Sequence, residues 1–509
     1  MQGDITNNIK ILQYPQIDPS IDLFRAVEVT DDAGNKKTEN QYGLSADKII
    51  KIIDGHTSFI TKYNENLNFF IGKNISIKQN IDRDAPDNEV NIPYARTLTH
   101  TVKGYMYKPG AITYSLDEEI ESTNQAYFDN LKAIFDENDE ELKNSLLGQD
   151  QSRYGIGFEI MYLKLDEGIT KPYFTTLDPK EIIPIFDYSV EKNMVCAIRY
   201  YTIDPTTEQT TNIDKPAIQV EVYYPTIIKY YELKKEAGRV TLTTNKPDAI
   251  NFFQDVPINI YKNNNELLAD YEPVRAMIIL LDKLMSDSAN ELDRFAAAYL
   301  IMQNFILGGD AQDRKQKLDS LKQLRVFEID GDGDIKFLTK EIPVEFFKEI
   351  KDSIRNDVIY HSSIPDFSDQ SFGTASGIAI RYKLIGLENL CGDKEAYFKE
   401  GLERRIELIN NFLKVKNIDS DVIKIKFTRN LPENITEAVD AFTKIDGKIS
   451  KETALGLLPF VLDIEKEMEL LKKEQEEANE MFDISNAMAT GRPDKAMIET
   501  EKADVKKIS

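Results

Sequence analysis

The feature that most limits the possible folds is a long helical period between Tyr271 and Leu307. Apolar or small side chains recur there at steps of three and four, the spacing of one helix face. The positions are Val274, Met277, Leu281, Leu284, Ser288, Leu292, Phe295, Tyr299 and Met302. Such a helix would be about 50 Å long and would end at Gly308-Gly309. Its reverse side is polar, so we expect it to pack beside other long helices, from this chain or from copies of it.

A second helix is predicted from Pro343 to about Tyr360, with apolar residues on one face. The two helices bracket a small module, residues 308–342. A stretch rich in Ser, Gly and Asp follows the second helix and predicts a flexible loop. Another long helix is expected from about Ser376 to Lys414. The layout is therefore hairpin-like: along one helix, round a tip, and back along another.

The sequence D-G-D-G-D-I-K-F-L-T-K-E, residues 330–341, has most of the spacing of a calcium-binding EF-hand loop. Position six of such a loop requires a sharp turn and favours glycine, but this position is Ile335. The flanking runs V-F-E-I and I-K-F-L favour a β-hairpin with glycines in its turn. Calcium binding by Asp330, Asp332, Asp334 and Glu341 remains the alternative interpretation.

The region from 155 to 262 is predicted to be an antiparallel sheet unit in an α+β domain. Three alternating runs indicate strands, at 157–165, 197–203 and 218–224. Residues 1–40 are polar and rich in turn-forming residues, which predicts a loosely held arm. A helical stretch follows from about Ser45 to Phe70.

Composition argues against several classes of function. The formal net charge is -24, which opposes nucleic-acid binding through bulk electrostatics. The three histidines have no partner at ligand spacing, and no catalytic motif is present, so an enzyme is not expected. An enzyme with dispersed carboxylates around the sheet is a second alternative, for which the sequence offers no catalytic constellation. Two distant cysteines indicate a reducing compartment. With no signal peptide and no membrane-spanning run, we expect a soluble protein.

Seven segments, taken in order over about residues 42–475, resemble the portal (head–tail connector) proteins of tailed bacteriophages, in the group typified by phage SPP1. They are F-F-I-G-K-N-I-S-I; N-I-P-Y-A-R-T-L-T-H-T-V-K-G-Y-M-Y-K-P-G; Y-G-I-G-F-E-I-M-Y-L with L-D-P-K-E-I-I-P-I-F-D; S-D-S-A-N-E-L-D-R-F-A; G-D-G-D-I-K-F-L-T-K; T-A-S-G-I-A-I-R-Y-K-L-I-G-L-E-N-L; and I-S-K-E-T-A-L-G-L-L-P-F-V.

The resemblance implies an α+β portal fold that assembles as a ring, usually of twelve identical subunits, at one capsid vertex. The implied parts are an N-terminal arm (1–41), a wing (42–268 and 378–450), a stem of two helices (269–307 and 343–361), a clip (308–342), a tunnel loop (362–377), and a crown with the C-terminal tail (451–509). Twelve copies would carry about 290 negative formal charges, so double-stranded DNA would pass without being gripped.

The resemblance also implies which residues meet which partners. The DNA-facing tunnel loop would be Asp369, Gln370, Ser371, Phe372, Gly373 and Thr374, a set without Lys or Arg. The clip residues that meet terminase and the head-completion adaptor would be Arg325, Glu328, Asp330, Asp332, Asp334 and Lys336. Major capsid and scaffolding proteins are further implied partners. No catalytic residue, cofactor, metal or membrane is expected, and the protein would be found in the host cytoplasm and then in the virion.

Overall fold

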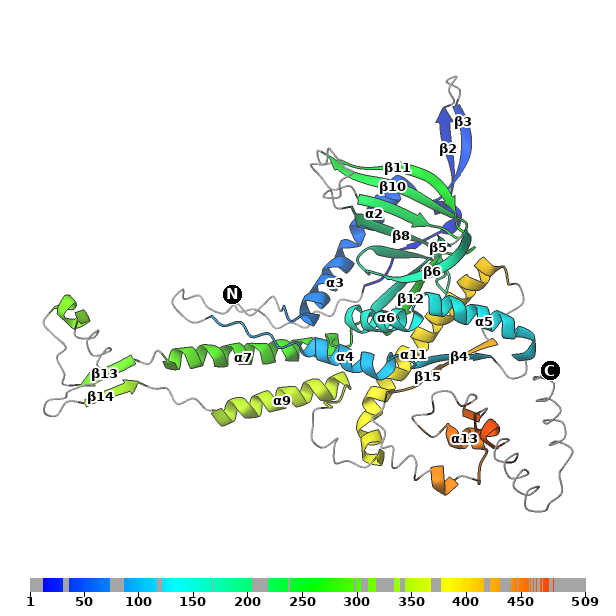
Figure 1. Cartoon of the computed structure of the whole chain (residues 1–509). Helices are drawn as coiled ribbons and strands as arrows, with labels where there is room; N and C mark the ends of the chain where they lie inside the picture. Colours follow the sequence, from blue (N-terminus) through cyan, green and yellow to red (C-terminus); the bar gives the residue numbers. More distant parts are fainter. Residues whose placement is uncertain are drawn as a thin grey trace, which may run out of the picture. The chain divides into compact units, whose positions relative to one another are not determined.

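The computed structural model describes residues 12–30, 36–73, 87–116, 121–166, 168–203, 218–236, 239–296, 299–303, 310–316, 334–338, 344–367, 377–415, 422–430 and parts of 440–479. The chain divides into two compact units. The first comprises Met1–Thr374 and Arg381–Asn430, and the second comprises Ala375–Ile380 and Leu431–Ser509. The architecture is mixed α+β (Figure 1).

The larger sheet of the first unit has six strands in the order β1-β7-β8-β9-β10-β11. Their bounds are β1 (Gln16–Ile17), β7 (Ile182–Asp187), β8 (Met194–Thr202), β9 (Ile218–Tyr223), β10 (Ile227–Glu236) and β11 (Arg239–Ile250). All neighbouring pairs are antiparallel except β1 and β7, which are parallel. The predicted antiparallel strands are therefore confirmed, and a short strand from the N-terminal region joins them.

Smaller sheets complete the β structure. Three strands pair in the order β12 (Ile258–Lys262), β5 (Ile156–Asp166) and β6 (Ile169–Leu177). Two-stranded pairs are β4 (Ile112–Leu116) with β15 (Ile423–Phe427), and β2 (Phe24–Thr30) with β3 (Lys36–Tyr42). The region predicted as one sheet unit thus forms two sheets, because β5 turns back on β6 and pairs on its other side with β12.

Helices pack against these sheets and against one another (Figure 1). In the first unit they are α1 (Pro19–Asp22), α2 (Ala46–Gly55), α3 (Thr57–Phe70), α4 (Tyr94–Met106), α5 (Glu121–Glu137), α6 (Glu140–Tyr154), η1 (Glu272–Val274), α7 (Arg275–Ala296), α9 (Val344–Ser362) and, from Arg381 onward, α11 (Gly377–Leu413). The second unit contains α13 (Lys451–Leu455). Ser45 begins α2, where its hydroxyl accepts from the Lys48 backbone N–H at 3.2 Å.

The expectation of a loosely held N-terminal arm is wrong for residues 12–24. Ile17 and Leu23 are buried in the core beneath the six-stranded sheet, at 1% and 2% exposure. The Tyr14 ring stacks on Phe59 with ring centroids 4.5 Å apart. The polar composition of the region concealed these few apolar anchors, which are enough to fix a short segment through burial.

The long-helix prediction is correct over α7 but wrong beyond it. Residues Tyr299–Gln303 form strand β13, which pairs antiparallel with β14 (Asp334–Leu338). The run Y-L-I-M is apolar at every position, so it satisfies a helical stripe and a strand equally well. Its aromatic and β-branched residues favour the strand.

His56 lies between α2 and α3 and is 2% exposed. Its Nδ1 is 2.8 Å from the Tyr200 hydroxyl, and burial lowers the pKa of the imidazole to about 4. In the unfolded chain the imidazole has a pKa near 6.5, so it is protonated at pH 5, whereas the imidazole of folded His56 stays mostly neutral. Between pH 7.5 and pH 5, we therefore expect His56 to lower the free energy of unfolding by about 2 kcal/mol.

Denaturant unfolding at these two pH values measures this loss. His56→Gln is expected to reduce the pH dependence by that amount. His361→Gln, which changes an exposed residue of α9, serves as the control and should keep the wild-type slope. Equal slopes for both variants would contradict the role assigned to His56.

Candidate functional site

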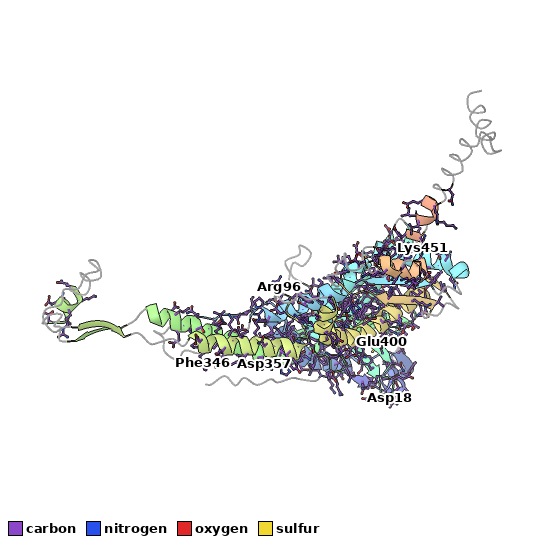
Figure 2. All side chains as sticks on the ribbon, turned by 90° about the horizontal axis from the view of Figure 1, so that it is seen from below. Asp18, Arg96, Phe346, Asp357, Glu400 and Lys451 are labelled. Atoms are coloured by element: carbon purple, nitrogen blue, oxygen red, sulfur yellow. The ribbon has the colours of Figure 1, made fainter. Side chains whose placement is uncertain are left out.

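Helices α7 and α9 form an antiparallel pair that lies side by side in Figure 1. Ile278 and Leu281 of α7 and Ile354 and Val358 of α9 are buried. Other large apolar residues of the pair stay in solvent. They are Leu280 (41% exposed) and Leu292 (62%) on α7, and Phe346 (57%) and Tyr360 (79%) on α9; Figure 2 labels Phe346 on this helix. The pair therefore has an apolar surface that its own unit leaves uncovered.

Part of the polar side of α7 is buried by the chain itself. Asp282, Ser286 and Asn290 are 0%, 1% and 6% exposed. They accept hydrogen bonds from the backbone of residues 88–92, which covers them. The apolar stripe of the sequence thus identified the helix, but not which of its faces the chain itself covers.

The root of α7, residues 267–275, is held by buried hydrogen bonds and ion pairs. The Lys394 ammonium of α11 is fully buried and donates to both carboxylate oxygens of Asp270, at 2.8 and 2.9 Å. Lys62 of α3 donates to the Leu267 carbonyl at 2.9 Å and lies 3.5 Å from Glu272. Burial lowers the pKa of Lys62, and Glu272 opposes this shift. These contacts fix the point at which α7 leaves the sheets.

A second buried cation joins α11 to the three-stranded sheet. Arg405 is 0% exposed and donates to both oxygens of Glu159 in β5, at 3.0 and 2.7 Å. It also donates to Asn144 at 2.8 Å and lies 3.3 Å from Glu140, both in α6. Burial raises the pKa of the Glu140 carboxyl, and Arg405 opposes this shift. Lys394 and Arg405 are eleven residues apart, about three helical turns, so α11 meets the sheet and α6 along one face.

Comparison with known proteins decides the family. The sequence profile of a family described as "Phage portal protein, SPP1 Gp6-like" matches residues 49–481, most of the chain. The chain belongs to this family. The portal protein of Clostridium phage phiCD119 is 27% identical over 326 residues, covering 62% of this chain and 69% of that protein. The portal protein of Bacillus phage SPP1 is 24% identical over 322 residues, covering 59% and 61%.

Portal proteins of this family are structural proteins rather than enzymes, and they serve as bacteriophage head–tail connectors in DNA packaging. Family membership implies an oligomeric ring through which DNA passes, and a place in the virion. Across the described helices of this portal protein, none is long and apolar enough to cross a membrane.

The expected DNA-facing residues of the portal protein, Asp369 to Thr374, lie outside the described residues. Their flanks are described: α9 ends at Ser362, and α11 begins at Gly377. Just before the loop, Asp366 pairs with Arg355 of α9. The two helices that flank the expected loop are thus described, whereas residues 368–376 lie outside the described residues, so the tunnel loop stays a prediction.

The expected clip residues are described only in part. Arg325, Glu328, Asp330 and Asp332 lie outside the described residues, whereas the backbones of Asp334 and Lys336 lie in β14. Gln303 pairs with Asp334 and Ile301 with Lys336. The strand after the acidic turn is thus confirmed, and its described partner is β13; the expected partner, residues 326–329, lies outside the described residues.

This strand bears on the calcium alternative. Positions five to nine of the supposed calcium loop, Asp334 to Leu338, form an extended strand instead of turning sharply at position six. In the described part of the chain, no three His, Cys, Asp or Glu side chains gather in a way that would hold a metal ion. Three of the four supposed calcium ligands, Asp330, Asp332 and Glu341, lie outside the described residues.

The buried cations, which hold α11 and the root of α7, are residues that sequence reasoning missed. Arg404 and Arg405 are neighbours in sequence, yet the Arg404 side chain is 27% exposed and that of Arg405 is fully buried. Only the pattern of apolar residues around them distinguishes the buried arginine from the partly exposed one. Leu402, Ile406 and Ile409 mark the buried face of α11, and Arg405 lies on it.

Proposed function

We propose that this portal protein forms a ring of twelve subunits at a unique capsid vertex, where double-stranded DNA enters during packaging and leaves during ejection. The observation that carries the proposal is the paired helices α7 and α9, with Leu280, Leu292 and Phe346 left in solvent. In a ring, such residues are covered by the neighbouring copy, and burial of apolar area then stabilises the assembly.

In this proposal α7 and α9 form the stem, and residues 308–342 form the clip that docks terminase and later the head-completion adaptor. The loop 362–377 is the tunnel loop, where Asp369 to Thr374 face the DNA. The wing comprises 42–268 and 378–450, and the crown and tail comprise 451–509. Capsid and scaffolding proteins meet the ring during assembly. The net charge of -24 per subunit supports DNA passage without tight binding.

Electron microscopy of the purified protein tests the ring, and one matched pair of substitutions tests its interface. Leu292→Glu places a charge on the exposed face of α7, and it is expected to abolish rings because the charge would be buried between subunits. Leu165→Glu is the control, since Leu165 is 75% exposed at the β5–β6 turn.

Both variants should keep the thermal stability of the wild-type subunit, because both side chains are exposed in it. Rings are expected for the wild type and Leu165→Glu, and single subunits for Leu292→Glu. A wild-type protein that remains monomeric in all salt conditions would overturn the proposed ring. Normal rings from Leu292→Glu would exclude this face of α7 as the interface.

A further inference from the structure

Residues 87–92, here called the strap, run along the polar side of α7. Alternate backbone N–H groups of the strap donate to side chains of the helix. Asn88 donates to Asn290 Oδ1 at 2.7 Å, Val90 to Ser286 Oγ at 2.9 Å, and Ile92 to Asp282 Oδ1 at 2.8 Å. In addition, Asn88 Nδ2 donates to Asp293 at 2.6 Å. We call Asp282, Ser286 and Asn290 the polar ladder.

The strap and the ladder match because two different repeats are nearly equal in length. Every second residue of an extended chain advances about 6.6 Å, and every fourth residue of an α-helix advances about 6 Å. Three strap amides therefore meet three ladder side chains in register, with the strap and helix running in opposite directions. The side chains of residues 87–90 alternate between exposed and half-buried, and those of Asn91 and Ile92 are both half-buried.

Each ladder side chain accepts a hydrogen bond from the strap, and Ser286 also donates to the Asp282 carbonyl of its own helix at 2.8 Å. All three ladder residues are buried, and a buried polar group without a partner is strongly unfavourable. The strap leads directly into α4, which begins at Tyr94 and packs on α6. The strap therefore ties the rotation of α7 about its own axis to the body formed by α4, α6 and the sheets.

We propose that the strap is a positioning device, which sets the face that α7 presents to the neighbouring subunit and to the channel. This inference rests on the proposed ring. The ladder residues act as positioning residues: they hold α7 so that Leu280 and Leu292, which lie off the ladder, point away from the strap. Without the strap, α7 loses the contact on its polar side that opposes rotation, and the stem helices of a ring are less uniformly oriented.

Two proline substitutions separate the strap hydrogen bonds from general effects of proline. Val90→Pro removes the N–H that donates to Ser286. Glu89→Pro is the matched control, since no acceptor for its N–H is found among the described residues. Hydrogen–deuterium exchange of peptides covering 87–93 and 280–293 is the first readout. Exchange is expected to become about tenfold faster in Val90→Pro, the effect of about 1.4 kcal/mol, and to stay unchanged in Glu89→Pro.

A second series changes the helix instead of the strap. Ser286→Ala removes the acceptor for Val90, whereas Ser288→Ala removes only a hydroxyl that donates to the Leu284 carbonyl of its own helix, at 2.7 Å. Ser286→Thr keeps a hydroxyl and is expected to restore slow exchange. The second readout is DNA packaged by a phage whose portal is replaced by each variant. We expect about tenfold less packaged DNA for Val90→Pro and Ser286→Ala than for their controls, with recovery in Ser286→Thr.

The outcomes are distinguishable. Wild-type exchange in Val90→Pro and Ser286→Ala would overturn the strap. If exchange is faster but the variants package as much DNA as their controls, the strap is a purely structural contact and its positioning role is overturned. If Val90→Pro does not fold, the serine series decides. If the wild-type protein forms no rings, the proposed function fails, whereas the exchange experiments still decide whether the strap holds α7.

Discussion

Arg405→Leu is expected to lower the free energy of unfolding of the first unit by about 3–5 kcal/mol, because it leaves carboxylates buried without their cation. Glu159 loses two hydrogen bonds at 3.0 and 2.7 Å, and Glu140 loses a cation at 3.3 Å. The guanidinium also lies 4.4 Å from the centre of the Phe174 ring, so a cation–π contact is lost as well. Denaturant unfolding monitored by circular dichroism measures the change.

The neighbouring residue provides the control for this experiment. Arg404→Leu removes a partly exposed cation that lies 3.0 Å from Asp255, and it should cost less than about 1 kcal/mol. The double variant Arg405→Leu with Glu159→Leu is expected to be more stable than Arg405→Leu, because it also removes the carboxylate that would be buried without its cation. If Arg405→Leu were as stable as Arg404→Leu, the buried ion pair would not have the energetic role inferred from its contacts.

Lys394→Met is expected to cost a similar amount, about 3–5 kcal/mol, and to loosen the root of α7. The methionine fits the volume of the lysine stem, but Asp270 would then be buried without its ammonium partner. Ser152 and Asn263 would also lose a donor, at 2.9 and 2.5 Å. Since Asp270 directly precedes Tyr271 and η1, the damage is expected at the start of the long helix.

Limited proteolysis shows where the structure opens, and denaturant unfolding shows by how much it is destabilised. New cleavage sites are expected within 264–272 in Lys394→Met. Lys399→Met, which removes a half-exposed lysine 3.4 Å from Glu403, is the control and should show neither effect. Asp270→Asn combined with Lys394→Met should recover part of the stability. Cleavage at wild-type positions only would refute the link between Lys394 and the root of α7.

The parts of this structure that sequence reasoning predicted are those with long periodic patterns. Helices α7, α9 and α11 repeat every 3.6 residues for several turns, and strands β5, β8 and β9 alternate, so local pattern and fold agree. The end of α7 was missed because Y-L-I-M, which is apolar throughout, fits both periods. The α+β class followed from these elements.

The parts that escaped prediction depend on contacts between distant residues. The strap sequence D-N-E-V-N-I has no period, and its partners lie about 200 positions later. Lys394 and Asp270 are 124 residues apart. As residue types, they look the same in the sequence as charged residues on the surface. The predicted order of segments (helix, module, helix, loop) put the expected tunnel loop between α9 and α11. That order alone does not predict where side chains lie.

The short ladder between β13 and β14 has a consequence for how the chain can vary. It joins Gln303 to Asp334, so the thirty residues between them begin and end at neighbouring points of the backbone. The entropy of closing a loop rises only with the logarithm of its length, so doubling this segment would cost about 0.6 kcal/mol more. A change in the length of residues 304–333 is therefore expected to cost little free energy of closure between β13 and β14.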